Sequence, residues 1–168
     1  MKLLQKIRGD SATLPARASN QAIGLAFIGG FLAISVIALL AQGLHVALVL
    51  GSFGASCVLV FGYPDVPFSQ PRNVIVGHVL STAVGLACVH LLGAHWWSVS
   101  LAVGSAIALM MLTRTVHPPA GSNPVIVFLL QPDWSFVLFP TLIGAVLLVL
   151  VALLFHNFTR PSRWPKYW

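Results

Sequence analysis

The apolar run QAIGLAFIGGFLAISVIALLA, at 21–41, contains no charged residue. A run of about 20 apolar residues is long enough to cross the hydrocarbon core of a membrane as a helix. Other apolar runs follow it, and only 7% of the 168 residues are charged, against about 25% in soluble domains. The chain is therefore expected to be an all-α integral membrane protein.

Six hydrophobic segments follow one another along the chain. They cover residues 21–41, 45–62, 73–93, 97–114, 118–130 and 136–157. The second is interrupted by Gly and Ser, and the fifth is short and follows a His-Pro-Pro turn. We expect all six to cross the membrane. The alternative is four full spans with the second and fifth segments re-entrant, because short apolar stretches often are.

Lys and Arg residues fall on one side of the membrane if all six segments cross. With a cytoplasmic N-terminus, Arg72 and Arg114 lie in cytoplasmic loops. The loops expected outside contain neither Lys nor Arg, namely 42–44, 94–96 and 131–135. Positive residues favour the cytoplasmic side. We therefore expect both termini in the cytoplasm, in a bacterial inner membrane.

One transmembrane domain is expected, at 21–157, between a basic N-terminal segment at 1–20 and a basic tail at 158–168. Its two halves, at about 21–93 and 97–157, share a short similarity. GASCVLVF in the first half resembles GSNPVIVF in the second, and Pro-Asp soon follows each. Three crossings per half would give the halves opposite topology, as in the inverted repeats of secondary transporters.

The matching stretches GSFGAS and PPAGSN predict two broken helices. Proline removes a backbone donor, and freed backbone groups in a membrane must be buried in protein or face a water-filled cavity. A helix that begins at such a break points its N–H groups at whatever lies there. A small monovalent anion would suit two such ends near the midplane. The expected binding residues are Ser52, Gly54, Ser56, Gly121, Ser122 and Asn123. Close helix packing is the alternative role of the glycines and serines.

Four further polar residues are expected to line the anion's route, namely Arg72, Asn73, His78 and His117. Asn73 and Gly77 are four residues apart and share a helix face, with His78 on an adjoining strip. A titrating histidine is also suited to coupling proton and anion movement. The alternatives are an interfacial anchor for Arg72, a helix cap for Asn73, and a hydrogen bond that caps the break for His117.

The sequence gives little support for an enzyme, a metal site or a cofactor. Asp65 and Asp133 lie in expected loops, so neither provides a buried carboxylate for acid–base work. Ser122 and His117 would form a serine nucleophile and base, but no third acid is available to orient them. The histidines lack metal-ligand spacing. Nucleic acid is excluded as a partner because no basic soluble domain is present.

Three stretches, GSFGASCVLVFG, QPRNVIVGH and HPPAGSNP, resemble the signature motifs of the HPP family of integral membrane proteins. The resemblance covers nearly the whole chain. It implies transport of a small anion, with nitrite as the expected substrate, because members of that family are implicated in nitrite transport. Many relatives continue the third motif with GAT, where this chain has Ser122-Asn123-Pro124. An anion channel and a structural or accessory subunit are the alternatives.

A homo-oligomer, such as a dimer, is expected because one bundle of this size offers little scaffold to move against. Glycine-rich faces with Gly24, Gly29 and Gly30 are the expected packing surfaces between subunits. The surrounding lipid bilayer is the other expected partner.

Overall fold

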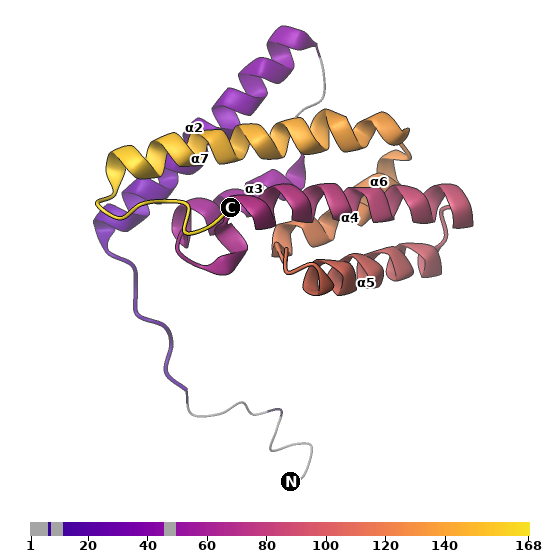
Figure 1. The fold of residues 1–168 in the computed structure, drawn as a ribbon, viewed down its shortest axis with the longest axis horizontal. Coiled ribbons are helices and arrows are strands. Elements are labelled where there is room, and N and C mark those ends of the chain that lie inside the picture. The colour runs from indigo at the N-terminus through magenta and orange to yellow at the C-terminus, as the bar shows by residue number, and fades with distance from the viewer. Residues whose placement is uncertain (1–6, 8–11, 46–49) are drawn as a thin grey trace.

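The computed structural model describes residues 7, 12–45 and 50–168, and every regular element in these ranges is helical (Figure 1). Half of the predicted basic segment 1–20, namely residues 1–6 and 8–11, lies outside the described residues. The α-helices are α2 (Asn20–Leu44), α3 (Gly51–Gly62), α4 (Pro71–Leu92), α5 (Trp96–Leu112), α6 (Asn123–Leu130) and α7 (Ile143–Thr159). Short 3-10 turns are η1 (Pro67–Ser69), η2 (Pro118–Ser122) and η3 (Trp134–Val137), and the π-turn η4 (Leu138–Leu142) precedes α7.

Three of the described helical segments are long and apolar enough to cross a membrane: α2, α4 and the stretch Trp134–Thr159. The other apolar helices are shorter, and α3 has only 12 residues. Such a helix is roughly 18 Å long, well below the ~30 Å of hydrocarbon core. The second predicted segment therefore contains a half-length helix that begins at Gly51, and residues 46–49 lie outside the described part.

The sixth predicted segment is not one continuous helix. Phe139 has extended backbone angles (φ −123°, ψ 121°) between η3 and α7. Pro140 follows it, and proline has no N–H to continue a helical hydrogen-bond ladder. Thr141 follows this break, in η4 just before α7, and faces the middle of α4, where its hydroxyl lies 3.2 Å from that of Thr82.

The six segments alternate in direction, as contacts between neighbouring helices show. A Cβ on Gly29 of α2 would meet Phe61 at the end of α3, whereas Gly30 lies near Cys57, one turn earlier, so these helices are antiparallel. α4 and α5 pack together and are joined by a short turn. Figure 1 shows the same alternation for the remaining helices around α4.

A stripe of small residues on α4 brings the proline-containing segment into close contact. Gly77, Ser81 and Gly85 are spaced four apart and lie on one helix face. A Cβ on Gly77 would lie 2.9 Å from the Cβ of His117, and one on Gly85 would lie 2.8 Å from the Cα of Pro124. Between them, the Ser81 hydroxyl donates a 2.6 Å hydrogen bond to the carbonyl of Ala120. Small residues allow such backbone approach inside membranes.

The apolar core lies between α2, α3 and α7. Phe61 packs edge-on against Phe155 and also contacts His156. Gly29 is buried against the Phe61 ring, where an added Cβ would come within 2.3 Å of a ring carbon, whereas Gly24 faces open space. Gly29 therefore serves packing within the chain, which differs from its expected place between subunits.

The C-terminal tail covers the ends of α3 and α4 that the sequence predicts to be cytoplasmic. Asp65 pairs with Arg160 and with Lys166. Trp164 is 1% exposed and donates its indole N–H to the carbonyl of Pro64. Trp164 is thus a buried anchor, unlike Trp96, which is 82% exposed. Exposed tryptophans are common where a helix meets the membrane surface.

Gly85→Ala tests the close approach of the proline-containing segment. The added methyl group would meet the Pro124 backbone, and overpacking costs about 1–3 kcal/mol, which exceeds the ~1 kcal/mol gained in helix propensity. The midpoint of thermal unfolding in detergent should therefore fall. Gly104→Ala is the matched control, because nothing lies within 4 Å of that position. Equal midpoints for both variants would contradict the packing described for α4.

Asp65→Asn tests the attachment of the tail. Burial by itself would raise the pKa of Asp65, but the hydrogen bonds and charges of Arg160 and Lys166 outweigh it and leave this pKa below 3.8. Since the folded pKa is lowered, the attachment contributes stability at neutral pH and loses it as the pH falls through that lowered value. Trypsin cleavage after Arg163 at neutral pH should be up to about fivefold faster in the variant, because exposed ion pairs contribute about 0.2–1 kcal/mol. Asp133→Asn should cleave at the wild-type rate.

Candidate functional site

A line of hydrogen-bonded polar groups runs through the interior from the loop before α4 to the middle of that helix. Its side chains come from α3, α4, α6, η4 and the segment before η2, and all of them are at most 1% exposed. We call this line the buried polar chain, and its members in order are the Phe68 carbonyl, His117, Ser56, His78, Asn123, Thr82 and Thr141.

Ser56 is the centre of the buried polar chain. Its Oγ lies 2.9 Å from Nε2 of His78 and 2.8 Å from Nε2 of His117. The two imidazole rings stand 5.0 Å apart in an edge-on arrangement. Because Ser56 is on α3, His78 on α4 and His117 just before η2, one hydroxyl joins both interrupted segments to the central helix.

The hydrogen-bond partners fix the tautomer of each histidine. Nδ1 of His117 lies 2.7 Å from the carbonyl of Phe68, which only accepts, so Nδ1 carries the proton and Nε2 accepts. Nδ1 of His78 lies 3.1 Å from the amide nitrogen of Asn123, so it accepts and Nε2 carries the proton. His78 thus donates to Ser56, and Ser56 donates to His117. The Asn123 amide orientation is assigned from these same contacts.

Two buried polar atoms beside the buried polar chain have no hydrogen-bond partner within the described residues. They are the hydroxyl of Ser52 and the side-chain carbonyl of Asn123. Ser52 is one helical turn before Ser56, and its backbone carbonyl lies 3.0 Å from the Ser56 hydroxyl. A buried polar group without a partner costs about 1–3 kcal/mol. The free Ser52 hydroxyl therefore offers an unused donor to a polar guest near the start of α3.

No acidic side chain contacts the buried polar chain within the described residues. Asp65 and Asp133 are in loops, and their partners are Arg160, Lys166 and Ser135. Within the part of the protein that the structure describes, no three His, Cys, Asp or Glu side chains lie close enough together to hold a metal ion. The site is thus made of neutral groups that both donate and accept hydrogen bonds, which suits an uncharged or singly charged small guest better than a divalent metal.

The structure brings together half of the binding residues expected from the sequence. Ser56, His78, His117 and Asn123 are in the buried polar chain, and Ser52 adjoins it. The others lie elsewhere, namely Gly54, Arg72, Asn73, Gly121 and Ser122.

The positions outside the buried polar chain have different surroundings. Ser122 is exposed and donates to the carbonyl of Pro119 instead of reaching His117, because η2 turns its side chain back along the chain. Gly121 is partly buried in the same turn. The contact between Ser122 and His117 that was considered from the sequence is therefore absent. The serine that contacts His117 is Ser56.

Arg72 and Asn73 lie at the start of α4. Arg72 is exposed and donates to the carbonyl of Thr113, which ties α4 to the end of α5. Asn73 is buried and donates to the carbonyl of Val116, while its own carbonyl accepts from the Tyr167 hydroxyl. Asn73 thus connects the tail to the residue before His117.

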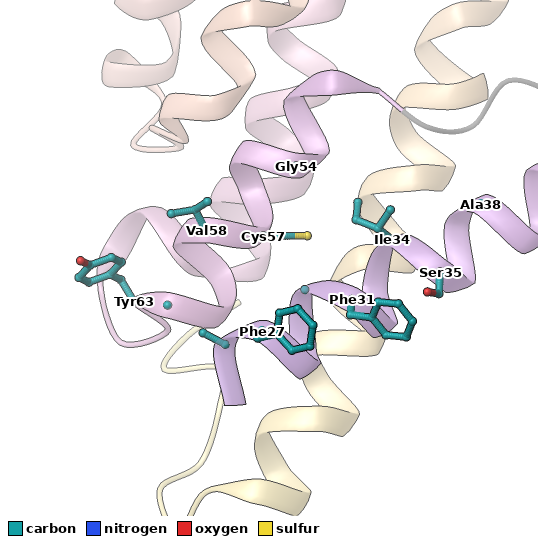
Figure 2. A pocket seen from close by; sticks show the side chains of 12 residues that line it. Phe27, Phe31, Ile34, Ser35, Ala38, Gly54, Cys57, Val58 and Tyr63 are labelled. Carbon is teal, nitrogen blue, oxygen red and sulfur yellow. The ribbon is translucent and has the colours of Figure 1, made fainter. Parts of the chain in front are cut away.

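Gly54 lies in a different place from the buried polar chain. It lines a groove of about 670 Å³ between α2 and α3, together with Phe31, Ile34 and Cys57 (Figure 2). Figure 2 shows mostly apolar side chains along this groove, with the hydroxyls of Ser35 and Tyr63 towards its two ends. Its apolar lining fits lipid or another apolar helix and offers little to an anion.

Sequence reasoning missed Ser81, Thr82 and Thr141. Ser81 and Thr82 follow Gly77 and His78 by four residues, so the helical period could have found them on the same two strips of α4. Thr141 had no such signal, because its position depends on the break at Phe139.

Apolar helices long enough to span a bilayer surround the buried polar chain, and together they define an integral membrane protein of the all-α class. The family model described as the HPP transmembrane region matches residues 15–165. The chain therefore belongs to the HPP family.

Two proteins of Dictyostelium discoideum, both named only as transmembrane proteins, are similar to this chain. One is 36% identical over 166 residues, which cover 92% of this chain and 53% of the relative. The other is 37% identical over 158 residues, which cover 87% of this chain and 55% of the relative. The chain spans about half the length of these relatives. No solved structure matches it.

Imidazole tautomers in the buried polar chain can be measured by nitrogen NMR of histidine-labelled protein in nanodiscs. At neutral pH we expect His117 to carry its proton on Nδ1 and His78 on Nε2, because of the partners given above. Ser56→Ala should shift both Nε2 signals, while the signal of His90, bonded to the carbonyl of Leu86, should stay in place. The opposite tautomers would show that the hydrogen bonds run the other way.

Proposed function

We propose that this protein transports a small monovalent inorganic anion, with nitrite as the first candidate. The observation that carries the proposal is the meeting of both interrupted segments at Ser56, where one hydroxyl contacts His78 and His117. Neutral donors in a buried site hold a singly charged anion without the strong attraction that would prevent its release. The family resemblance to members implicated in nitrite transport supports the choice of substrate.

Two inverted halves are part of the proposal. The alternating directions of the six segments give α3 and α6 opposite directions, and both helices begin near the buried polar chain, where α3 contacts η2. Helix N-termini favour negative charge. An anion that accepts from the free hydroxyl of Ser52 would lie between these two ends, where discontinuous helices of secondary transporters bind their substrates.

The proposed setting is a bacterial inner membrane with both termini in the cytoplasm. Arg72, Arg114 and the basic tail then lie on the cytoplasmic side, in agreement with the positive-inside rule. A homodimer is the proposed assembly. Within it, the outward face of α2 near Gly24 has open space for a neighbouring helix.

The proposal also holds that the protein is not an enzyme and needs no cofactor. Ser56 and His117 have the contact that serine nucleophiles make with a base. The orienting group of His117 is the backbone carbonyl of Phe68, and no acid within the described residues takes that role. A fluorophosphonate probe, which reacts with activated serines, should therefore leave Ser56 unlabelled. Labelling that Ser56→Ala abolishes would favour a hydrolase.

Nitrite uptake into proteoliposomes tests the transport proposal. Wild-type protein should give saturable uptake above that of protein-free liposomes. Ser56→Ala leaves two buried imidazoles short of a partner, at about 1–3 kcal/mol each, so uptake should fall at least about tenfold. Ser100→Ala is the matched control, because that exposed hydroxyl contacts only the carbonyl of Trp96, four residues earlier in α5.

The outcome of this assay separates the alternatives. Saturable uptake supports a carrier, whereas linear uptake with single-channel currents in planar bilayers supports a channel. Absence of uptake for nitrite and for other small anions, with monodisperse protein, would leave a structural or accessory subunit as the function. Full uptake by Ser56→Ala would remove the buried polar chain from the transport path.

A further inference from the structure

The Ser56 hydroxyl has a second acceptor in reach, which gives the cluster two complete hydrogen-bonding arrangements. In the first, Ser56 accepts from His78 and donates to Nε2 of His117, at 2.9 and 2.8 Å. In the second, the hydroxyl turns to the backbone carbonyl of Ser52, 3.0 Å away. Its oxygen then accepts from both imidazoles. The second arrangement requires a proton on Nε2 of His117.

One proton from the aqueous phase can therefore enter without loss of a hydrogen bond. It forms the Nε2–H bond of His117, no other covalent bond changes, and the ring becomes a cation that still donates through Nδ1 to the carbonyl of Phe68. The accepting nitrogen of His78 is less suited to this role. This nitrogen, Nδ1, accepts from an amide N–H of Asn123. A proton on Nδ1 would require the Asn123 amide to turn and present its oxygen instead. The amide nitrogen would then no longer donate to the Thr82 hydroxyl, which is 2.8 Å away.

Among the residues that the structure describes, none provides a counter-ion near the resulting cation. The helices that hold the cluster, α3 and α4, pack against α2, α5, α6, α7 and the four short turns η1 to η4. The other titratable or charged side chains of α3 and α4 are Cys57, which faces Gly30 of α2, and Arg72, Cys88 and His90. Among the elements packed against them, α7 contributes His156, which contacts the carbonyl of Val60, and the others contribute none. Arg114, in the loop before η2, is exposed. Asp65 is occupied by Arg160 and Lys166. An isolated charge inside a membrane is costly, so a protonated His117 needs an anion that comes from outside.

We propose that the cluster of Ser52, Ser56, His78 and His117 binds one proton together with each transported anion, so that transport is electroneutral. The proton is held on Nε2 of His117 while the anion lies beside the ring and accepts from the free hydroxyl of Ser52. The anion neutralises the imidazolium, and the imidazolium neutralises the anion. This inference rests on the proposed transport function and adds a proton as the second substrate.

Proton uptake on nitrite binding tests the coupling directly. Purified wild-type protein in a weakly buffered detergent solution at about neutral pH is titrated with sodium nitrite. A pH dye reports proton uptake, and calorimetry measures nitrite binding. We expect about one proton taken up per nitrite bound. The apparent nitrite affinity should weaken about tenfold per pH unit above the pKa of the site, as linkage of one proton requires. Sodium chloride at the same concentrations corrects for ionic-strength effects.

Variants locate the proton. His117→Gln should bind nitrite with no proton uptake and no pH dependence, whereas His78→Gln should retain both because its amide can still donate to Ser56. His90→Gln, at the far end of α4 from His117, should match the wild type. Thermal unfolding and size-exclusion profiles check that each variant is folded. A pH dependence that survives in His117→Gln and disappears in His78→Gln would overturn the assignment.

Failures of the two proposals are distinguishable. Absence of nitrite binding and of nitrite uptake by wild-type protein contradicts the transport proposal. Binding or uptake with no proton taken up contradicts the coupling alone. In proteoliposomes with potassium and valinomycin, coupled uptake should follow an imposed pH gradient and ignore an imposed membrane potential. Uptake driven by the potential would equally exclude electroneutral coupling.

Discussion

The close approach of the proline-containing segment to α4 is the constraint on which the interior depends. Gly77 and Gly85 leave no room for a Cβ, and Ser81 fixes the Ala120 carbonyl between them. This contact places the ring of His117 beside that of His78. With larger residues on the same strip, the two rings would separate by more than the reach of one hydroxyl, and Ser56 could not join them.

Helix identity and approximate bounds followed from the sequence because apolar runs in a membrane leave few other options. The two short segments were recognisable from their glycines and prolines. The break at Phe139 was not, because one proline at 140 inside an apolar run does not reveal whether a helix bends or stops there.

Site residues were predicted less well than helices, for a physical reason. Sequence spacing identifies a helix face but not the rotation of that helix against its neighbours. Ser52 and Ser56 share the face of α3 that meets the histidines, whereas Gly54, between them, faces the groove with α2. His78 and Asn123 were both expected at the site, but the contact between them depends on the turn of η2 towards α4, which sequence spacing does not reveal.

Asn73 also links the tail to the buried polar chain. Its side-chain amide donates to the carbonyl of Val116, next to His117, and its side-chain carbonyl accepts from the hydroxyl of Tyr167. A movement of the tail at Tyr167 would therefore reach the surroundings of His117 through one side chain. The docking of the tail and the arrangement of the buried histidines are thus not independent of each other.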